Sequence, residues 1–184
     1  MVALAVIPAP ARADTLLVPF WGINFGGDSG KNFSDAVDSS RYAYGARFTF
    51  MGGGVFGIEG DFGYSPDFFG KTDVGGSSVL TATGNLVVGI PFGGQKGFGI
   101  RPYGVVGLGM MKSSADFEQV EENSLTWGFG GGLSMFFSTH YGIQFDFRYF
   151  RTFDDVELFG IEVVEDQPGK LDFTRTSLGF VFRF

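Results

Sequence analysis

Large apolar side chains alternate with small or polar ones along eight segments of this sequence. Alternation with a period of two is the pattern of a β-strand whose two faces meet different environments. It predicts strands over 15–26, 41–51, 55–65, 78–90, 100–111, 124–137, 141–153 and 171–184. The last segment places an apolar side chain at every second position from Leu178 to Phe184, while its other face carries Arg175 and Arg183. The apolar row therefore needs either a covering sheet or lipid.

The connections between these segments alternate in length. The stretches 27–40, 66–77, 112–123 and 154–170 are long and polar, whereas 52–54, 91–99 and 138–140 are shorter. Long loops at one end and short turns at the other are typical of an up-and-down transmembrane β-barrel. An even number of strands places both chain ends with the short turns. Most of the 20 acidic residues fall in the long connections, so we expect long acidic loops on the extracellular side.

The hairpin formed by 41–51 and 55–65 indicates which face is apolar. A turn at 52–54 would place Phe50 opposite Phe56, and Arg47 on the other face opposite Glu59. Apolar pairs and opposite charges across neighbouring strands both favour this register.

The hairpin formed by 124–137 and 141–153 has the same organisation. A turn at 138–140 places Met135 opposite Ile143 and Leu133 opposite Phe145, and the other face is polar and rich in glycine. Both hairpins thus predict an apolar outside and a polar inside, the reverse of a soluble barrel.

Aromatic residues on the predicted apolar face gather near its two ends. The long-connection end carries Tyr42, Tyr64, Trp127 and Tyr149, and the short-turn end carries Phe50, Phe56, Phe137 and Tyr141. Two such bands are typical of the aromatic girdles of a membrane barrel. A β-sandwich core rich in phenylalanine would explain burial but not two separate bands. Lipid is favoured, because a closed barrel satisfies every backbone polar group in a bilayer.

Charged residues occupy the opposite, inward face of the predicted strands. They are Arg47, Glu59, Asp61, Arg101, Asp146, Arg148, Arg175 and Arg183. Side chains fill the interior of an eight-stranded barrel, and buried charges must be paired there. We therefore expect a structural network of ion pairs. The alternative is a narrow gated pore whose ion pairs rearrange.

Composition narrows the class of protein further. The chain has no cysteine, which excludes disulfides and thiolate metal sites, and its net charge of −7 argues against a nucleic-acid partner. No apolar run reaches the roughly 18 residues of a transmembrane helix. Residues 1–13 contain a short apolar run and end in Ala11-Arg12-Ala13, a small-x-small cleavage pattern. We expect 1–13 to be the remnant of a signal peptide and 14–184 to form the barrel domain.

The C-terminal "LGFVFRF" looks like the signal that the bacterial β-barrel assembly machinery recognises, with Phe180, Phe182 and Phe184 as its aromatic residues. The stretches "RPYGVVGLGM" and "WGFGGGLSMFFSTHYGIQFDFRYF" resemble strands of small eight-stranded outer-membrane barrels of the OmpA-like type. The resemblance covers about 15–184 and implies an all-β, eight-stranded antiparallel barrel in the outer membrane, among phospholipid and lipopolysaccharide. The resemblance is to the barrel alone, so we do not expect the cell-wall tethering role of OmpA-like proteins that also have a peptidoglycan-binding domain.

Catalysis and cofactor binding have little support in the sequence. The single histidine, His140, follows Ser138 and Thr139 in a predicted turn, where a surface histidine is the ordinary interpretation. The glycine-rich segments precede no helix and are not phosphate loops, and no calcium-loop pattern is present. We expect no cofactor, no metal site and no enzyme activity. The expected role is structural or surface-interacting, with a possible extracellular ligand at the loops; the alternatives are the pore and an enzyme acting on outer-membrane lipid.

Overall fold

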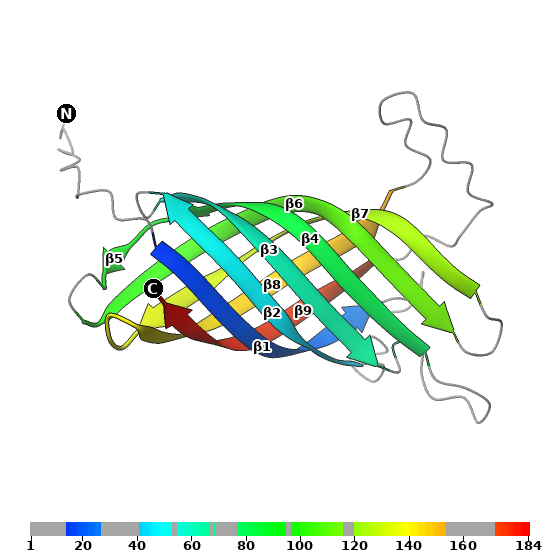
Figure 1. The fold of residues 1–184 in the computed structure, drawn as a ribbon, viewed down its shortest axis with the longest axis horizontal. Coiled ribbons are helices and arrows are strands. Elements are labelled where there is room, and N and C mark those ends of the chain that lie inside the picture. Colours follow the sequence, from blue (N-terminus) through cyan, green and yellow to red (C-terminus); the bar gives the residue numbers. More distant parts are fainter. Residues whose placement is uncertain are drawn as a thin grey trace.

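A computed structural model describes residues 14–26, 41–52, 55–66, 68, 77–94, 97–115, 120–153 and 172–184. Nine β-strands occupy these ranges (Figure 1). They are β1 (Asp14–Gly26), β2 (Arg41–Gly52), β3 (Phe56–Pro66), β4 (Ser77–Gly89), β5 (Phe92–Gly93), β6 (Gly99–Ala115), β7 (Val120–Phe136), β8 (Tyr141–Thr152) and β9 (Asp172–Arg183). No helix in the described part of the chain has the length and hydropathy needed to cross a membrane.

Eight of the strands close into an antiparallel barrel. The hydrogen-bonded order is β4-β3-β2-β1-β9-β8-β7-β6, and a further pairing of β4 with β6 completes the ring (Figure 1). Each strand lies beside its neighbours in sequence, apart from β5, which pairs only with Gly99 and Ile100 in a small hairpin. The predicted all-β, eight-stranded, up-and-down architecture is confirmed.

Both ends of the barrel sequence lie at the short-turn end. Phe182 and Arg183 of β9 pair with Leu17 and Leu16 of β1, and the Phe184 amide donates a 2.9 Å hydrogen bond to the Thr15 carbonyl. This pairing is the closing seam of the barrel. The long acidic loops expected at the other end lie mostly outside the described residues.

One long connection was predicted wrongly. Strand β6 ends at Ala115 and strand β7 begins at Val120, so only 116–119 separates them instead of the expected 112–123. Residues with polar side chains, such as Lys112 and Asn123, are still paired across the two strands there. A β-ladder needs hydrogen bonds along its length but not apolar side chains once it leaves the hydrocarbon, so polarity alone does not mark the end of a strand.

The predicted register of the β2–β3 hairpin is also wrong, by two residues. Gly52 pairs with Phe56, so the turn is 53–55, and Phe50 lies opposite Ile58. Arg47 lies directly opposite Asp61 instead of Glu59. A shift of two keeps every side chain on its predicted face, because the side-chain period of a strand is two.

The β7–β8 hairpin follows its predicted register. Met135 pairs with Ile143 and Leu133 with Phe145. The turn 137–140 is closed by a hydrogen bond from the Phe137 amide to the Tyr141 carbonyl.

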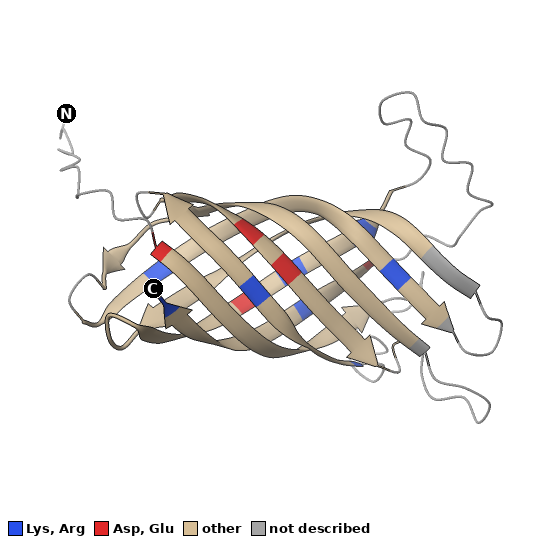
Figure 2. Cartoon of the chain, viewed as in Figure 1, with Lys and Arg blue, Asp and Glu red and all other residues tan. Residues whose placement is uncertain are grey.

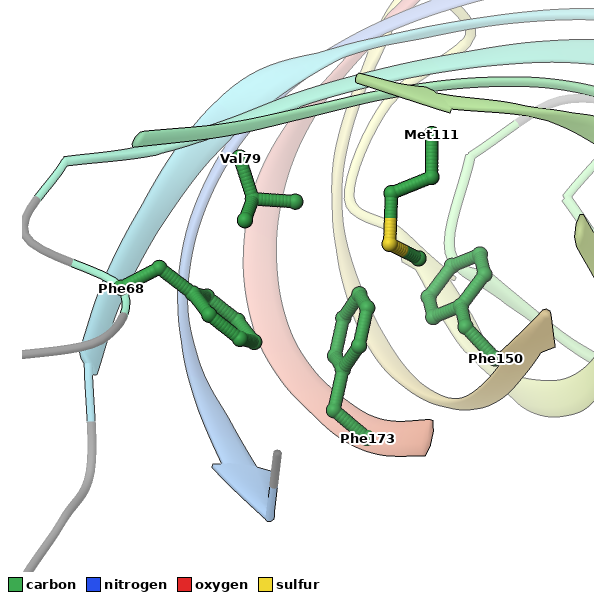
Figure 3. Close-up of a cluster of buried hydrophobic side chains, with 5 residues drawn as sticks. All are labelled: Phe68, Val79, Met111, Phe150 and Phe173. Atoms are coloured by element: carbon green, nitrogen blue, oxygen red, sulfur yellow. The ribbon is translucent and has the colours of Figure 1, made fainter. Parts of the chain in front are cut away.

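Three buried apolar clusters fill the lumen around the inward charges. The cluster at the long-connection end contains Phe68, Val79, Met111, Phe150 and Phe173, whose side chains converge across the lumen in Figure 3. Phe68 comes from the connection after β3 and packs edge-on against Phe173 with ring centroids 5.3 Å apart. The other two clusters lie toward the short turns; they contain Leu16, Val18, Phe136 and Val181 in one, and Met51, Val87, Tyr103 and Val105 in the other. The barrel core is therefore its interior.

Inward glycines make room for this core, and Gly63 is the sharpest case. A Cβ at Gly63 would collide with the Arg175 guanidinium and lie 2.8 Å from the Thr81 hydroxyl. Gly63→Val should lower the free energy of unfolding by about 1–3 kcal/mol, the usual cost of overpacking a filled core. Urea unfolding of the barrel in phospholipid vesicles measures the change. Gly104→Val is the control, since a Cβ there faces outward with its nearest neighbour at 3.8 Å; equal losses in both variants would contradict the assignment.

Candidate functional site

Six charged side chains form a closed cluster at the centre of the lumen, which we call the central cluster. It contains Arg47, Arg148 and Arg175 with Glu59, Asp61 and Asp146, and each of these side chains is at most 2% exposed. Figure 2 shows that acidic and basic positions alternate along the middle of the barrel wall. Three cations and three anions balance, so the cluster is neutral as a whole.

Asp61 and Asp146 each bridge two arginines, and at least one of the two comes from another strand. Asp61 accepts from Arg47 at 2.9 Å and from Arg175 at 2.5 Å. Asp146 lies 3.0 Å from Arg47 and 2.8 Å from Arg148. Since β2 and β3 are separated from β8 in the ring by β1 and β9, the Arg47–Asp146 pair crosses the lumen. The cluster therefore ties together strands that share no backbone hydrogen bonds.

Neutral groups add further hydrogen bonds and a ring contact to the central cluster. Arg148 also donates to Glu59 at 2.7 Å, whose other oxygen accepts from the Thr49 hydroxyl at 3.0 Å. Arg47 donates to the Gln144 carbonyl oxygen at 3.0 Å and lies over the Phe20 ring, 4.2 Å from its centroid. Such pairing offsets the cost of removing charges from water.

A second ion cluster lies at the short-turn end. Asp14 accepts from Arg101 at 2.6 Å through one oxygen and from Arg183 at 2.8 Å through the other. Both guanidinium groups also lie over the Phe136 ring, with centroid distances of 5.3 and 5.1 Å. One carboxylate thus joins the first strand, the last strand and β6.

The structure places all eight predicted interior charges in the lumen, but in two clusters instead of one network. Two members of these clusters were missed from sequence: Asp14, and Tyr103, whose hydroxyl donates to Asp146 at 2.5 Å. Tyr103 shares the inward parity of Arg101 on β6, and Asp14 shares that of the buried Leu16, Val18 and Phe20 on β1. Parity along each strand was the signal that could have identified them.

The predicted girdle residues lie on the outer wall. Tyr42, Tyr64, Phe50, Phe56, Phe137 and Tyr141 are exposed, and Trp127 and Tyr149 are half-buried against one another. Tyr44 and Trp21, which the sequence analysis did not select, extend the same band: Tyr44 packs on Tyr64 and Trp21 stacks on Tyr42. The outer surface is thus apolar and aromatic around its described circumference.

The C-terminal aromatics lie on the same wall. Phe180 and Phe184 are exposed and Phe182 is half-buried. Phe180 and Phe182 contact each other at 5.0 Å between centroids, and Tyr141 of β8 contacts both. Their recognition during assembly stays a prediction.

His140 lies in the exposed turn between β7 and β8. Its Nδ1 is 2.8 Å from the Thr139 hydroxyl, and its backbone amide donates to the Ser138 hydroxyl at 3.1 Å. These contacts are local turn bonds. Within the described ranges, no three histidine or carboxylate side chains are grouped so that they could hold a metal ion.

Removing one charge from the central cluster leaves others buried without partners. Asp61→Asn would deprive Arg47 and Arg175 of their shared carboxylate, and breaking a buried ion pair in this way costs about 3–5 kcal/mol. Guanidinium unfolding in vesicles should show this loss. Asp172→Asn makes the same chemical change at a half-buried site, where the carboxylate accepts from the neutral Tyr149 hydroxyl, and should cost under about 1.5 kcal/mol. A small effect of Asp61→Asn would contradict a structural role.

Three solved structures of small barrels superpose on the chain. They are Neisserial surface protein A (TM-score 0.64, 12% identity, 94% of this chain and 99% of that chain), the Yersinia pestis attachment invasion locus protein Ail in complex with the heparin analogue sucrose octasulfate (0.57, 16%, 94% and 98%) and the N-terminal β-barrel domain of Pseudomonas aeruginosa OprF (0.56, 16%, 95% and 99%). At these identities the likeness shows a shared fold. No curated protein sequence matches the chain.

The family comparison covers the whole sequence. Residues 1–184 match the family described as "Outer membrane protein beta-barrel domain". This match agrees with the closed barrel, its apolar outer wall and its bacterial outer-membrane neighbours in structure. The chain therefore belongs to the outer membrane protein beta-barrel family, and its place is the bacterial outer membrane.

Proposed function

We propose that the protein is a non-catalytic barrel whose role is structural or surface-interacting, with its long acidic connections outside the cell as the contact region. The observation that supports this role best is the filled lumen. The lumen contains an apolar cluster at the long-connection end and the central cluster in the middle. Two further apolar clusters and the second ion cluster lie toward the short turns. With the interior filled and the wall in lipid, the connections are the part that can meet a partner.

The charge of these connections favours a cationic partner. Residues 27–40, 67–76, 116–119 and 154–171 together hold 13 acidic residues and three lysines. The Ail structure contains a sulfated heparin analogue, and a polyanion of that kind would be repelled by such connections. A basic protein surface is the complementary class. Apolar residues in the sequence of 154–170, such as Phe159, would add contact area.

Two further parts of the proposal concern biogenesis. Residues 1–13 would be removed as a signal peptide, which leaves Asp14 at the start of the barrel and at the centre of the second ion cluster. Phe180, Phe182 and Phe184 would present the assembly signal, since they share one outward face of β9. Phospholipid and lipopolysaccharide would surround the girdles, where the aromatic rings suit the boundary of the hydrocarbon.

The pore and the enzyme have weaker support. Ion flow past the central cluster would require several ion pairs to open together, and an apolar cluster lies on each side of it. The only histidine is exposed in a turn with local hydroxyl contacts. Both alternatives can be tested separately from the role of the loops.

Deleting 157–167 should abolish adhesion of cells that display the barrel, because the deletion removes four of the 13 acidic residues together with the apolar residues of this connection. Adhesion to immobilised extracellular-matrix proteins and to host-cell monolayers measures the effect. The control is Glu59→Gln, a lumen variant that should lose stability but keep adhesion where folded. Unchanged adhesion after the deletion would disprove the surface role of this connection.

Planar-bilayer recordings test the pore. The wild-type barrel should give no step currents under conditions in which a reconstituted porin conducts, and Glu59→Gln should stay silent too, because the apolar clusters still fill the lumen. Step currents in the wild type that change in Glu59→Gln would establish a conducting path instead.

A further inference from the structure

The outer wall carries a hollow whose floor is a pair of glycines, Gly60 of β3 and Gly84 of β4. The two residues lie directly opposite each other and both face outward. The hollow, which we call the glycine groove, has a volume of about 1140 Å³. The large side chains around it are Phe48, Phe50, Ile58, Phe62, Leu86, Val106, Leu108, Trp127 and Phe153. Most of its lining residues lie on β2, β3, β4, β6 and β7, which are neighbouring strands of the barrel wall (Figure 1).

The strand register explains the shape of the groove. One row of paired positions runs Phe48, Gly60, Gly84, Leu108 and Trp127 across five strands. The next row toward the short turns is filled by Phe50, Ile58, Leu86, Val106 and Phe129. Phe48 and Leu108 are separated by three strand spacings of about 4.8 Å each. The missing side chains between them therefore leave a gap about 14 Å wide beside a continuous ridge.

The packing of the barrel does not require these glycines. A Cβ added at Gly84 would meet nothing within 4 Å, and one at Gly60 would make only an ordinary 3.5 Å contact with Phe62. Gly63, three residues further along β3 on the inward face, is different because a Cβ there would collide with Arg175. Glycine within a strand weakens it and often marks a close approach by a ligand. The groove is therefore best explained by what fills it from outside.

The depth of the groove connects its floor to the extracellular surface. Strands of such barrels tilt by roughly 40° and rise about 3.4 Å per residue. Gly84 lies five residues before the short-turn end of β4 at Gly89, and Trp127 lies nine before that of β7 at Phe136. These counts place the floor about 13 Å and Trp127 about 23 Å above the short turns, in an apolar band about 25 Å tall. The groove thus ascends from mid-membrane to the outer interface.

Cationic groups lie on the wall above the groove. Arg151 pairs directly with Trp127 in the next strand of the same register row and is half-buried. Lys112 lies four residues beyond Leu108 on β6 with the same outward parity, also half-buried. Arginine beside an aromatic at this level suits the phosphate of a lipid headgroup. An apolar groove below and cations above together match an anionic lipid.

We propose that the glycine groove binds one acyl chain of lipid A in the outer leaflet, with Arg151 on its phosphate. The choice of leaflet rests on the proposed orientation, with the long connections outside. The groove is continuous with the lipid-facing wall, so hydrocarbon is already its neighbour. A symmetric dimer centred here fits poorly, because the same concave patch on both partners would leave a void.

Filling the groove tests the proposal. Native mass spectrometry of the barrel in detergent micelles, titrated with lipid A, should show a single retained lipid. Gly84→Leu should weaken its retention at least about tenfold, since the leucine takes the space of the chain. Gly104→Leu is the matched control: it is an exposed, outward glycine on β6 outside the groove and should retain lipid A like the wild type. The heat-dependent gel shift of each variant verifies folding.

Arg151→Gln tests the headgroup contact separately. This variant should lower the affinity for bisphosphorylated lipid A toward the affinity for monophosphoryl lipid A. Gly84→Leu should instead weaken the binding of both lipids. Equal retention by wild type, Gly84→Leu and Arg151→Gln would overturn the site. Equal binding of phosphatidylethanolamine would overturn lipid A as the occupant, and a dimer lost in Gly84→Leu would assign the groove to a second copy. None of these readouts involves the long connections, so a failure here is distinct from a failure of the adhesion role.

Discussion

The rest of the barrel depends on the need to pair charges that are buried in the lumen. An eight-stranded ring leaves space for side chains only, and an isolated ion there is costly. Asp61 meets this constraint by accepting from Arg47 and Arg175, and Asp146 by lying between Arg47 and Arg148. Because partners come from opposite sides of the ring, the pairing fixes the barrel's cross-section as well as its charge balance.

The same constraint separates the two surfaces of the wall. Inward positions carry ions, polar groups, the three apolar clusters and glycines that make room for them, whereas outward positions carry mainly aromatic and branched side chains. The outward side chains do not pack against other parts of the protein interior. Their apolar composition is therefore explained by contact with lipid. Glycine therefore occurs at Gly63 and Gly60 of β3 for different reasons. The Arg175 guanidinium fills the space that a side chain at Gly63 would need, whereas Gly60 borders an open groove.

Sequence periodicity predicted the strands and their faces well, because one-residue parity is strongly enforced when one side is apolar. The turn after β2 was misplaced because Gly52, Gly53 and Gly54 are equally able to turn, and parity does not distinguish shifts of two. The pairing of Arg47 with Asp146 could not be predicted, since it depends on the stagger of the closed ring. Asp14 was overlooked as a lumen charge because it directly follows the expected cleavage pattern. The glycine groove was overlooked because a glycine has no side chain that would indicate which environment its face meets.

The central cluster divides unequally between the two halves of the chain. Strands β1–β4 contribute Arg47, Glu59 and Asp61, an excess of one negative charge, and β6–β9 contribute Asp146, Arg148 and Arg175, an excess of one positive charge. Neither half can neutralise its own interior. If the chain were cut in the connection between β4 and β6, the two fragments would carry opposite net charges on their inward faces. Their reassociation would then be favoured by ion pairs across the lumen as well as by strand pairing at the two seams.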